Sequence, residues 1–183
     1  MMRVIAGTAR GKNLQALPGE EVTRPTINRV KEAMFSSVQF LVPGARVLDM
    51  FAGSGQLGIE ALSRGAKSCV FVDQSASALA VVTANCTTAG VARAADIRSG
   101  EALRFLANIR GPFDLVLLDP PYRQNTLAAV LPALESKVAP GGVVLCESER
   151  EADLPETVGS LTRVKQYFYG KIMVTRYEKE EQV

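Results

Sequence analysis

Three glycines close together, Gly53, Gly55 and Gly58, mark the first stretch of this chain that could do chemistry. They follow an apolar run that starts at Val47 and lead into residues with a helical pattern. Because glycine lacks a Cβ atom, its backbone adopts positive φ at little cost and can lie directly against a ligand. A helix that starts there also offers free N–H groups and a positive dipole end. We therefore expect a buried strand, a tight turn and a helix N-terminus that hold a ligand.

The spacing of these glycines, Gly-x-Gly-x-x-Gly, is that of dinucleotide-binding loops. Asp73 follows Gly53 by 20 residues. Its carboxylate could accept hydrogen bonds from both hydroxyls of a ribose. This stretch alone leaves NAD and other adenosine-containing cofactors open.

A second candidate site is the sequence Asp119-Pro120-Pro121-Tyr122, which ends an apolar run. Two consecutive prolines have fixed φ and no N–H donors, which leaves rigid carbonyl groups. Such carbonyls and a carboxylate suit the binding of a planar exocyclic amine through its hydrogens, so that the nitrogen lone pair points at an electrophile. Tyr122 offers a face on which a flipped base could stack. A dehydrogenase has no use for this motif, which favours a reaction on the amino group of a base.

The elements that must position these residues alternate along the chain. We expect strands at 46–50, 68–72, 94–98, 113–118 and 142–146, and helices at about 56–64, 77–88, 101–108 and 126–138. Strands that are nearly all apolar and alternate with helices indicate a parallel sheet covered on both faces. The residues 162–169 and 171–178, joined at Gly170, read as an antiparallel pair at the sheet edge.

Acidic residues recur at or near the ends of these strands. In a doubly wound sheet, ligands bind beyond the carboxyl ends of the strands. We therefore expect one crevice to be lined by Asp49, Asp73, Glu101, Asp119 and Glu147. A helix-start acid favoured by the dipole is the alternative for Glu101.

The first 43 residues form a basic extension that differs from the rest. Residues 1–31 hold six Lys and Arg against two Glu, a net of +4, whereas the whole chain carries +2. A helix should run from an N-cap at Thr26 to about Leu41, with Arg29 and Lys31 away from its apolar stripe. We divide the chain into 1–43, a basic arm and helix, and 44–183. The uneven charge suggests a polyanionic partner.

Composition excludes several classes of site. The chain has no histidine and three widely spaced cysteines, which excludes the usual zinc sites and a histidine general base, so we expect no metal. No apolar run approaches the roughly 18 residues of a membrane span. The N-terminus lacks the apolar region of a signal peptide. We expect a cytoplasmic protein with no membrane partner.

At these residues the chain resembles a known family. Residues 47–58 with Asp73 are similar to the S-adenosylmethionine site of class I methyltransferases, and residues 119–122 resemble the (D/N/S)PP(Y/F/W) motif of amino-group N-methyltransferases. More narrowly, the stretches 3–7, 23–32 and 48–66 resemble the bacterial 16S ribosomal RNA guanine-N2 methyltransferases. The chain departs from the family at Glu101, where many relatives of this fold carry Asp, and at Ala9, where relatives tend to have a bulky aromatic or a basic residue.

The resemblance implies a Rossmann-like fold: a doubly wound, mostly parallel, seven-stranded sheet with a C-terminal antiparallel hairpin and a short basic N-terminal extension. It also implies three groups of site residues. Those for S-adenosylmethionine are Asp49, Phe51, Gly53, Gly55, Asp73, Gln74, Glu101 and Ala102. The catalytic residues are Asp119, Pro120, Pro121 and Tyr122. The contacts to nucleic acid are Arg10, Lys12, Arg24, Thr26, Arg29 and Arg123.

The implied reaction is transfer of a methyl group to the exocyclic N2 amine of a guanine in 16S rRNA, within the small ribosomal subunit or its assembly intermediate. The implied enzyme works as a monomer without a metal. Two alternatives remain open. A DNA adenine-N6 methyltransferase shares the Asp-Pro-Pro-Tyr chemistry but usually carries a target-recognition insertion, for which this chain has room only in its arm. A non-catalytic module that binds an adenosine cofactor or NAD is the other.

Overall fold

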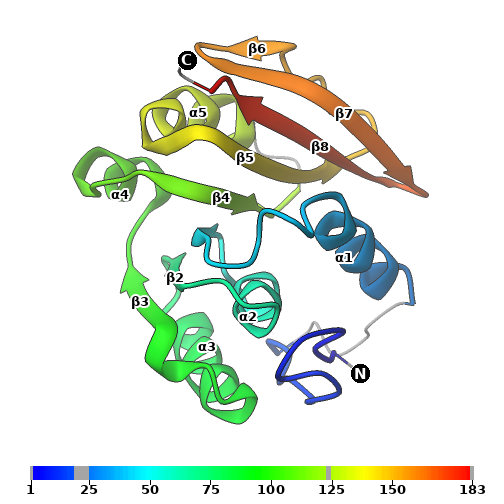
Figure 1. The fold of residues 1–183 in the computed structure, drawn as a ribbon, viewed down its shortest axis with the longest axis vertical. Coiled ribbons are helices and arrows are strands. Elements are labelled where there is room, and N and C mark those ends of the chain that lie inside the picture. The colour runs from blue at the N-terminus through cyan, green and yellow to red at the C-terminus, as the bar shows by residue number, and fades with distance from the viewer. Residues whose placement is uncertain (1, 19–24, 123–124, 182–183) are drawn as a thin grey trace.

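The computed structural model describes residues 2–18, 25–122 and 125–181, with the backbone alone described at 25–27 (Figure 1). Its centre is an eight-stranded sheet in the order β3-β2-β1-β4-β5-β8-β7-β6. Five strands are parallel: β1 (Arg46–Met50), β2 (Ser68–Asp73), β3 (Ala95–Ser99), β4 (Phe113–Leu118) and β5 (Val138–Glu149). The last three, β6 (Thr157–Val158), β7 (Leu161–Tyr169) and β8 (Ile172–Lys179), continue the sheet by antiparallel pairing.

Helices cover both faces of the sheet. On one face lie α1 (Pro25–Ser37), α2 (Gln56–Ser63) and α3 (Ala76–Ala89), and on the other lie α4 (Ala102–Asn108) and α5 (Thr126–Leu134). Short 3-10 turns, η1 (Ala92–Ala94) and η2 (Glu135–Lys137), precede β3 and β5. The topology confirms the predicted doubly wound sheet with an antiparallel C-terminal hairpin.

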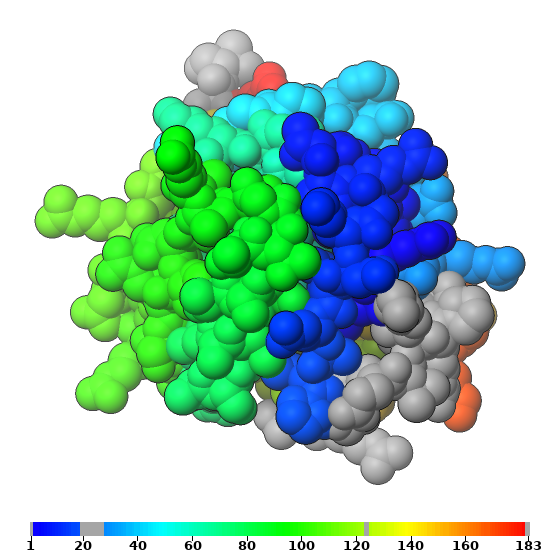
Figure 2. Space-filling model, turned by 90° about the horizontal axis from the view of Figure 1, so that it is seen from below, coloured from blue at the N-terminus to red at the C-terminus, as the bar shows by residue number. Residues whose placement is uncertain are grey.

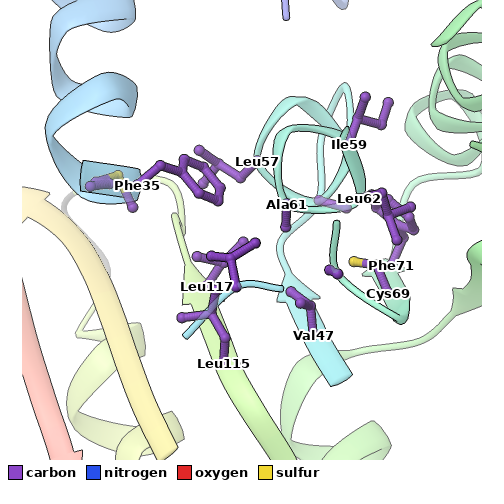
Figure 3. Packing of buried hydrophobic residues seen from close by; sticks show 14 of the residues in the cluster. Phe35, Val47, Leu57, Ile59, Ala61, Leu62, Cys69, Phe71, Leu115 and Leu117 are labelled. Atoms are coloured by element: carbon purple, nitrogen blue, oxygen red, sulfur yellow. The ribbon is translucent and has the colours of Figure 1, made fainter. Parts of the chain in front are cut away.

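Alternation along the strands produces two hydrophobic cores. Because successive side chains of a strand point to opposite faces, Val47 packs with α2 while Leu48 packs with α4 and α5. Leu115 and Leu117 of β4 lie with Val47 against the helices of the first face, where Phe35 and Ile59 complete the packing (Figure 3). The central strands β1 and β4 are thus buried on both sides, as their continuous apolar runs predict.

The sheet has one more strand than the seven expected. Thr157 and Val158 pair with Thr162 and Leu161 across a turn in which Gly159 has φ +58°. A two-residue strand is too short for alternation to reveal it in the sequence.

The boundary between α5 and β5 also differs from expectation. The helix α5 ends at Leu134, where 138 was expected, and β5 begins at Val138, where 142 was expected, so that the strand includes Pro140 and Gly141. The pairing register with β4 shifts there, since Val138 pairs with Phe113 and Val143 pairs with Leu115. Pairing with β4 therefore outweighs the local preference of proline and glycine.

Helix α1 begins at Pro25, so Thr26 lies in its first turn and is not the N-cap residue. Proline suits the first position of a helix, because its missing N–H would have no helical partner there. The helix ends at Ser37, earlier than the apolar pattern through Leu41 predicted.

The described part of the N-terminal arm packs on the body of the protein. Arg3 and Asn13 form an isolated antiparallel β-bridge, and Leu14 N–H donates to the Met2 carbonyl at 2.9 Å. Met2 and Leu14 belong to the same hydrophobic cluster as Val47. Figure 2 shows the N-terminal residues (blue) side by side with the green part of the chain that includes α3. No helix within the described ranges is long and apolar enough to span a membrane.

Candidate cofactor and catalytic site

A cavity of about 750 Å³ lies at the carboxyl ends of the central parallel strands. It brings together residues that both candidate motifs contribute. The predicted site residues that line it are Asp49, Phe51, Gly53, Asp73, Gln74, Glu101, Ala102, Asp119, Pro120, Pro121 and Tyr122. Of the predicted cofactor and catalytic residues, Gly55 alone is not part of this lining, since it caps the start of α2.

The loop between β1 and α2 has an unusual backbone. Gly53 and Gly55 have φ of +54° and +78°, and Phe51, with φ +64°, is the one non-glycine residue with positive φ in the described ranges. Such strain in a non-glycine residue is characteristic of functional sites. A Cβ atom on Gly53 would meet no atom nearer than 3.9 Å. The glycine therefore leaves a space beside the loop that a cofactor could fill.

Gly58 has a different role from the other two glycines. A Cβ atom there would lie 2.3 Å from Phe71 Cε1, so the third glycine lets α2 pack closely on β2. Its N–H donates to Asp49 Oδ2 at 2.9 Å, which places this carboxyl group at the positive end of α2. Burial raises the pKa of Asp49 to about 8, although the bond from Gly58 opposes the shift.

Asp73 joins the glycine loop to the next helix. Its Oδ2 accepts from Gly53 N–H at 3.0 Å and its Oδ1 from Ser75 N–H at 2.9 Å. These two bonds fix the carboxylate at the cavity wall. Each oxygen retains a further lone pair with which it could accept from a hydroxyl group.

Glu101 lies at the cavity and also caps α4. Its two oxygens accept from the N–H groups of Leu103 and Arg104 at 3.1 and 3.0 Å. These bonds lower the pKa of Glu101, which is exposed. Glu101 therefore caps the start of α4, as the alternative interpretation of this acid predicts. It also lines the cavity, where it could contact a ligand.

The motif 119–122 directly follows β4, and a hydrogen bond to Glu147 holds the tyrosine of the motif. Tyr122, 44% exposed, donates its hydroxyl to Glu147 Oε1 at 2.9 Å. Burial raises the pKa of Glu147, and the tyrosine hydrogen bond opposes that shift. Burial and the Glu147 charge raise the pKa of Tyr122. The phenol therefore stays protonated and oriented near neutral pH.

The cavity lining also includes Glu147, which the sequence predicted at the crevice, and residues that it did not predict, among them Met2 and Leu17. Glu147 lies near the carboxyl end of β5 and lines the cavity, as expected from the series of acids near strand ends. Met2 and Leu17 reach the cavity from the N-terminal arm, with Met2 Sδ accepting from Ser54 Oγ at 3.2 Å. Nothing in their sequence context indicates a cofactor site.

All the predicted nucleic-acid contacts except Arg123 belong to residues 1–43. Arg10, Lys12 and Arg29 are exposed. Arg24 and Arg123 lie outside the described residues, as does the side chain of Thr26. The structure thus describes three of these positions as open to a partner.

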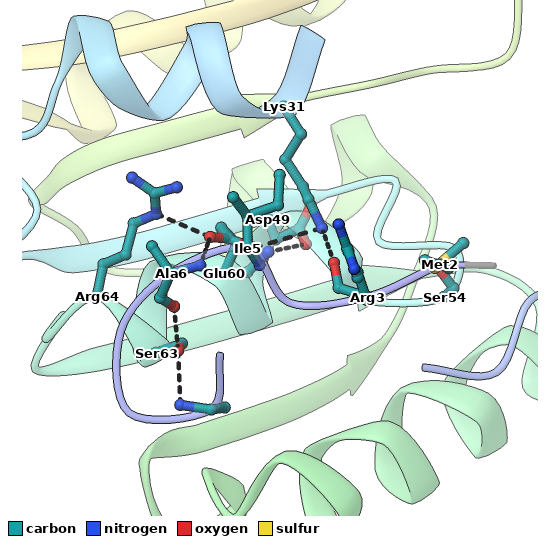
Figure 4. A network of polar contacts seen from close by, with 12 residues as sticks. Met2, Arg3, Ile5, Ala6, Lys31, Asp49, Ser54, Glu60, Ser63 and Arg64 are labelled. Atoms are coloured by element: carbon teal, nitrogen blue, oxygen red, sulfur yellow. Dashed lines mark hydrogen bonds and ion pairs between the residues drawn. The ribbon is translucent and has the colours of Figure 1, made fainter. Parts of the chain in front are cut away.

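The expectation that Lys31 lies on the surface is wrong. Its Nζ is buried 3.4 Å from Glu60 Oε2 and donates to the Arg3 carbonyl at 2.7 Å (Figure 4). Burial lowers the pKa of Lys31, and Glu60 opposes the shift. This lysine adds nothing to the basic surface. Within the described residues no cluster of three or more acidic or cysteine side chains could hold a metal ion.

The solved structures that this fold resembles define its class. "Putative methyltransferase yhhF from Escherichia coli" superposes with a TM-score of 0.87 at 31% identity, covering 98% of each chain. The glycine loop, the strand-end acids and this likeness make the protein a class I S-adenosylmethionine-dependent methyltransferase.

Residues 2–178 match the family described as "Conserved hypothetical protein 95". "Putative rRNA methyltransferase YlbH" of Bacillus subtilis is 40% identical over 97% of this chain and 99% of its own length. "Ribosomal RNA small subunit methyltransferase D" of Escherichia coli K12 is 32% identical over 99% and 91%. The chain belongs to this family of rRNA methyltransferases, which confirms the resemblance and the cofactor that it implies.

Proposed function

We propose that this protein methylates the exocyclic N2 amine of a guanine in 16S rRNA, in the small ribosomal subunit or its assembly intermediate. One observation carries the proposal. The Asp-Pro-Pro-Tyr motif of an amino-group methyltransferase lines the same cavity as Gly53 and Asp73 of the cofactor loop. The name of the Escherichia coli relative supports small-subunit rRNA as the substrate.

The cavity suits S-adenosylmethionine in size and in donor set. A volume of about 750 Å³ falls within the range of small-molecule sites. Asp73 would accept from the ribose hydroxyls, Asp49 would lie near the ammonium group, and Phe51 would pack against the cofactor. Gln74, Glu101 and Ala102 would border the adenine. When bound, the cofactor supplies an electrophilic methyl group on a sulfonium.

Residues 119–122 would position the base. The Asp119 carboxylate and the Pro120 carbonyl would accept the two hydrogens of the guanine amine, which directs its lone pair outward. Tyr122 would stack on the base, and the bond to Glu147 would hold its ring in place. Such positioning supplies most of the acceleration, because the reaction requires no covalent intermediate.

The basic arm would bind phosphates of the RNA. Arg10, Lys12 and Arg29 are exposed and would make such contacts, together with Arg24, Thr26 and Arg123. Phosphate contacts fix orientation without reading sequence. In this proposal residues 1–43 contact RNA and residues 44–183 perform methyl transfer.

A transfer assay with tritiated S-adenosylmethionine tests the proposal. Unmodified small-subunit particles, naked 16S rRNA and duplex DNA would be offered, and the product digested to nucleosides. We expect label in N2-methylguanosine from the RNA substrates. Label in N6-methyladenine from DNA would contradict the proposed RNA substrate but not the assignment of the cofactor site. Absence of transfer with cofactor still bound would favour a binding module.

A further inference from the structure

Buried polar side chains fasten the N-terminal segment 2–17 to the helices beneath it. Glu60 of α2, 0% exposed, accepts from Ile5 N–H at 2.9 Å and Ala6 N–H at 3.0 Å (Figure 4). Ser63 Oγ accepts from Ala9 N–H at 2.9 Å and donates to the Ala6 carbonyl at 2.6 Å. These side chains satisfy backbone groups that would otherwise be buried without partners.

Asn85 of α3 connects the N-terminal segment to the glycine loop. Its Oδ1 accepts from Gln15 N–H at 2.8 Å, and its Nδ2 donates to the Gln15 carbonyl at 2.9 Å. The same Nδ2 donates to the Ser54 carbonyl in the glycine loop at 2.8 Å. One fully buried amide therefore holds the segment and the loop at a fixed spacing.

The spacing between the N-terminal segment and the glycine loop sets the position of one wall of the cavity. Leu17 follows Gln15 by two residues and lines the cavity. A Cβ atom on Gly53 would lie 3.9 Å from Leu17 Cδ1, so the leucine faces the open side of the glycine loop. Asn85 itself is absent from the cavity lining. Its effect on a ligand must pass through the segment and the loop that it joins.

We propose that Asn85 is a positioning residue for the cofactor, since it holds Leu17 against the glycine loop to complete the cavity wall. This inference rests on the proposed assignment of the cavity to S-adenosylmethionine. It predicts a loss of cofactor affinity when Asn85 is truncated. The rate of the chemical step with cofactor saturating should change little, because Asn85 lines neither the catalytic motif nor the cofactor loop's open side.

The test is calorimetric titration of S-adenosylhomocysteine into the full-length protein. The variants are Asn85→Ala, Leu17→Ala and the double variant, with Thr87→Ala as control. Thr87 lies exposed on the same helix and bonds only within it, to the Thr83 carbonyl. We expect each single variant to weaken binding about tenfold, and the control to bind within about twofold of wild type. The double variant should lose little more than either single variant, because both changes act on one wall.

A purely structural role makes a different prediction. It would lower the unfolding midpoint of Asn85→Ala but leave affinity unchanged at temperatures where the variant is folded, and that result overturns the proposal. Multiplicative losses in the double variant overturn it as well. In the transfer assay, the KM for S-adenosylmethionine should rise while kcat changes less than about twofold. A fall in kcat at constant KM would contradict the proposal.

Two results separate this inference from the assignment on which it rests. A wild-type protein that does not bind S-adenosylhomocysteine would overturn the cavity assignment and the inference with it. If Asn85→Ala does not fold, Leu17→Ala decides, because it truncates only a partly exposed side chain. Unchanged affinity for S-adenosylhomocysteine in Leu17→Ala would then contradict the proposal that Leu17 completes the cavity wall.

Discussion

Asp49 and Asp73 lie at the carboxyl ends of neighbouring strands, yet their surroundings give them different properties. Asp73 accepts two backbone N–H bonds at the cavity wall. Asp49 is only 2% exposed, and burial raises its pKa to about 8 from an ordinary 3.8. Before a cofactor binds, Asp49 is therefore protonated over much of the neutral range.

This raised pKa makes stability depend on pH. The folded state keeps the Asp49 proton more tightly than the unfolded state, so its contribution to stability is full below 3.8 and is lost as pH rises to about 8. We expect the free energy of unfolding in urea to fall over this interval. In Asp49→Asn the slope should flatten, since Asn can still accept from Gly58 but does not titrate. The exposed control Asp153→Asn should keep the wild-type slope; equal slopes in Asp49→Asn would contradict the prediction.

Asp119 should matter for transfer and little for cofactor binding. We expect Asp119→Ala to lower the transfer rate at least about a hundredfold, because the guanine amine loses its charged acceptor. The affinity for S-adenosylhomocysteine should stay within about twofold. The exposed Asp96→Ala serves as control in both measurements. Retained transfer activity in Asp119→Ala would remove this residue from the mechanism.

At the scale of elements, the close packing of α2 on β2 requires that residue 58 has no side chain. In Gly58→Ala the new methyl group would overlap Phe71 and Cys69, so α2 must move away from β2. We expect a loss of about 1–3 kcal/mol in the free energy of unfolding, measured by urea denaturation. A gain in the free energy of unfolding, as the higher helix propensity of alanine alone would give, would argue against close packing.

The sequence predicted most elements because their apolar runs are long and regular. Strands β1 and β4 have the predicted bounds, since both faces of each are buried. Lys31 was misjudged because its burial depends on Glu60, a partner in another helix that no apolar pattern specifies. The strand-end acids were predictable from topology. Leu17 was not, since its place follows from the bonds of Asn85 to Gln15.

At the scale of the whole molecule, the arm exposes fewer cations than the sequence suggests. Those that are exposed remain accessible to a partner. Lys31 is paired inside, whereas Arg10 and Lys12 are exposed. If both bind RNA phosphates, each should release counterions on binding. The arm would then contribute a salt-dependent part of RNA affinity.

We expect Arg10→Ala/Lys12→Ala to weaken binding of 16S rRNA and to reduce the slope of log affinity against log salt by about 1.4, at roughly 0.7 for each phosphate contact. Filter binding across a potassium chloride series measures this slope. The double variant Arg93→Ala/Arg110→Ala removes two exposed cations outside the arm and should leave the slope unchanged. An unaltered slope in the arm variant would exclude these phosphate contacts.

The fastening of the N-terminal segment also has a consequence for how the chain folds. The segment is synthesised before its partners Glu60 and Asn85, which lie 54 to 70 positions later in the chain. Contacts between such distant positions form only after the cost of closing a long loop is met. The segment should therefore dock late, onto α2 and α3 that are already in place. Cofactor binding would then distinguish a completely folded molecule from one whose first residues have yet to dock.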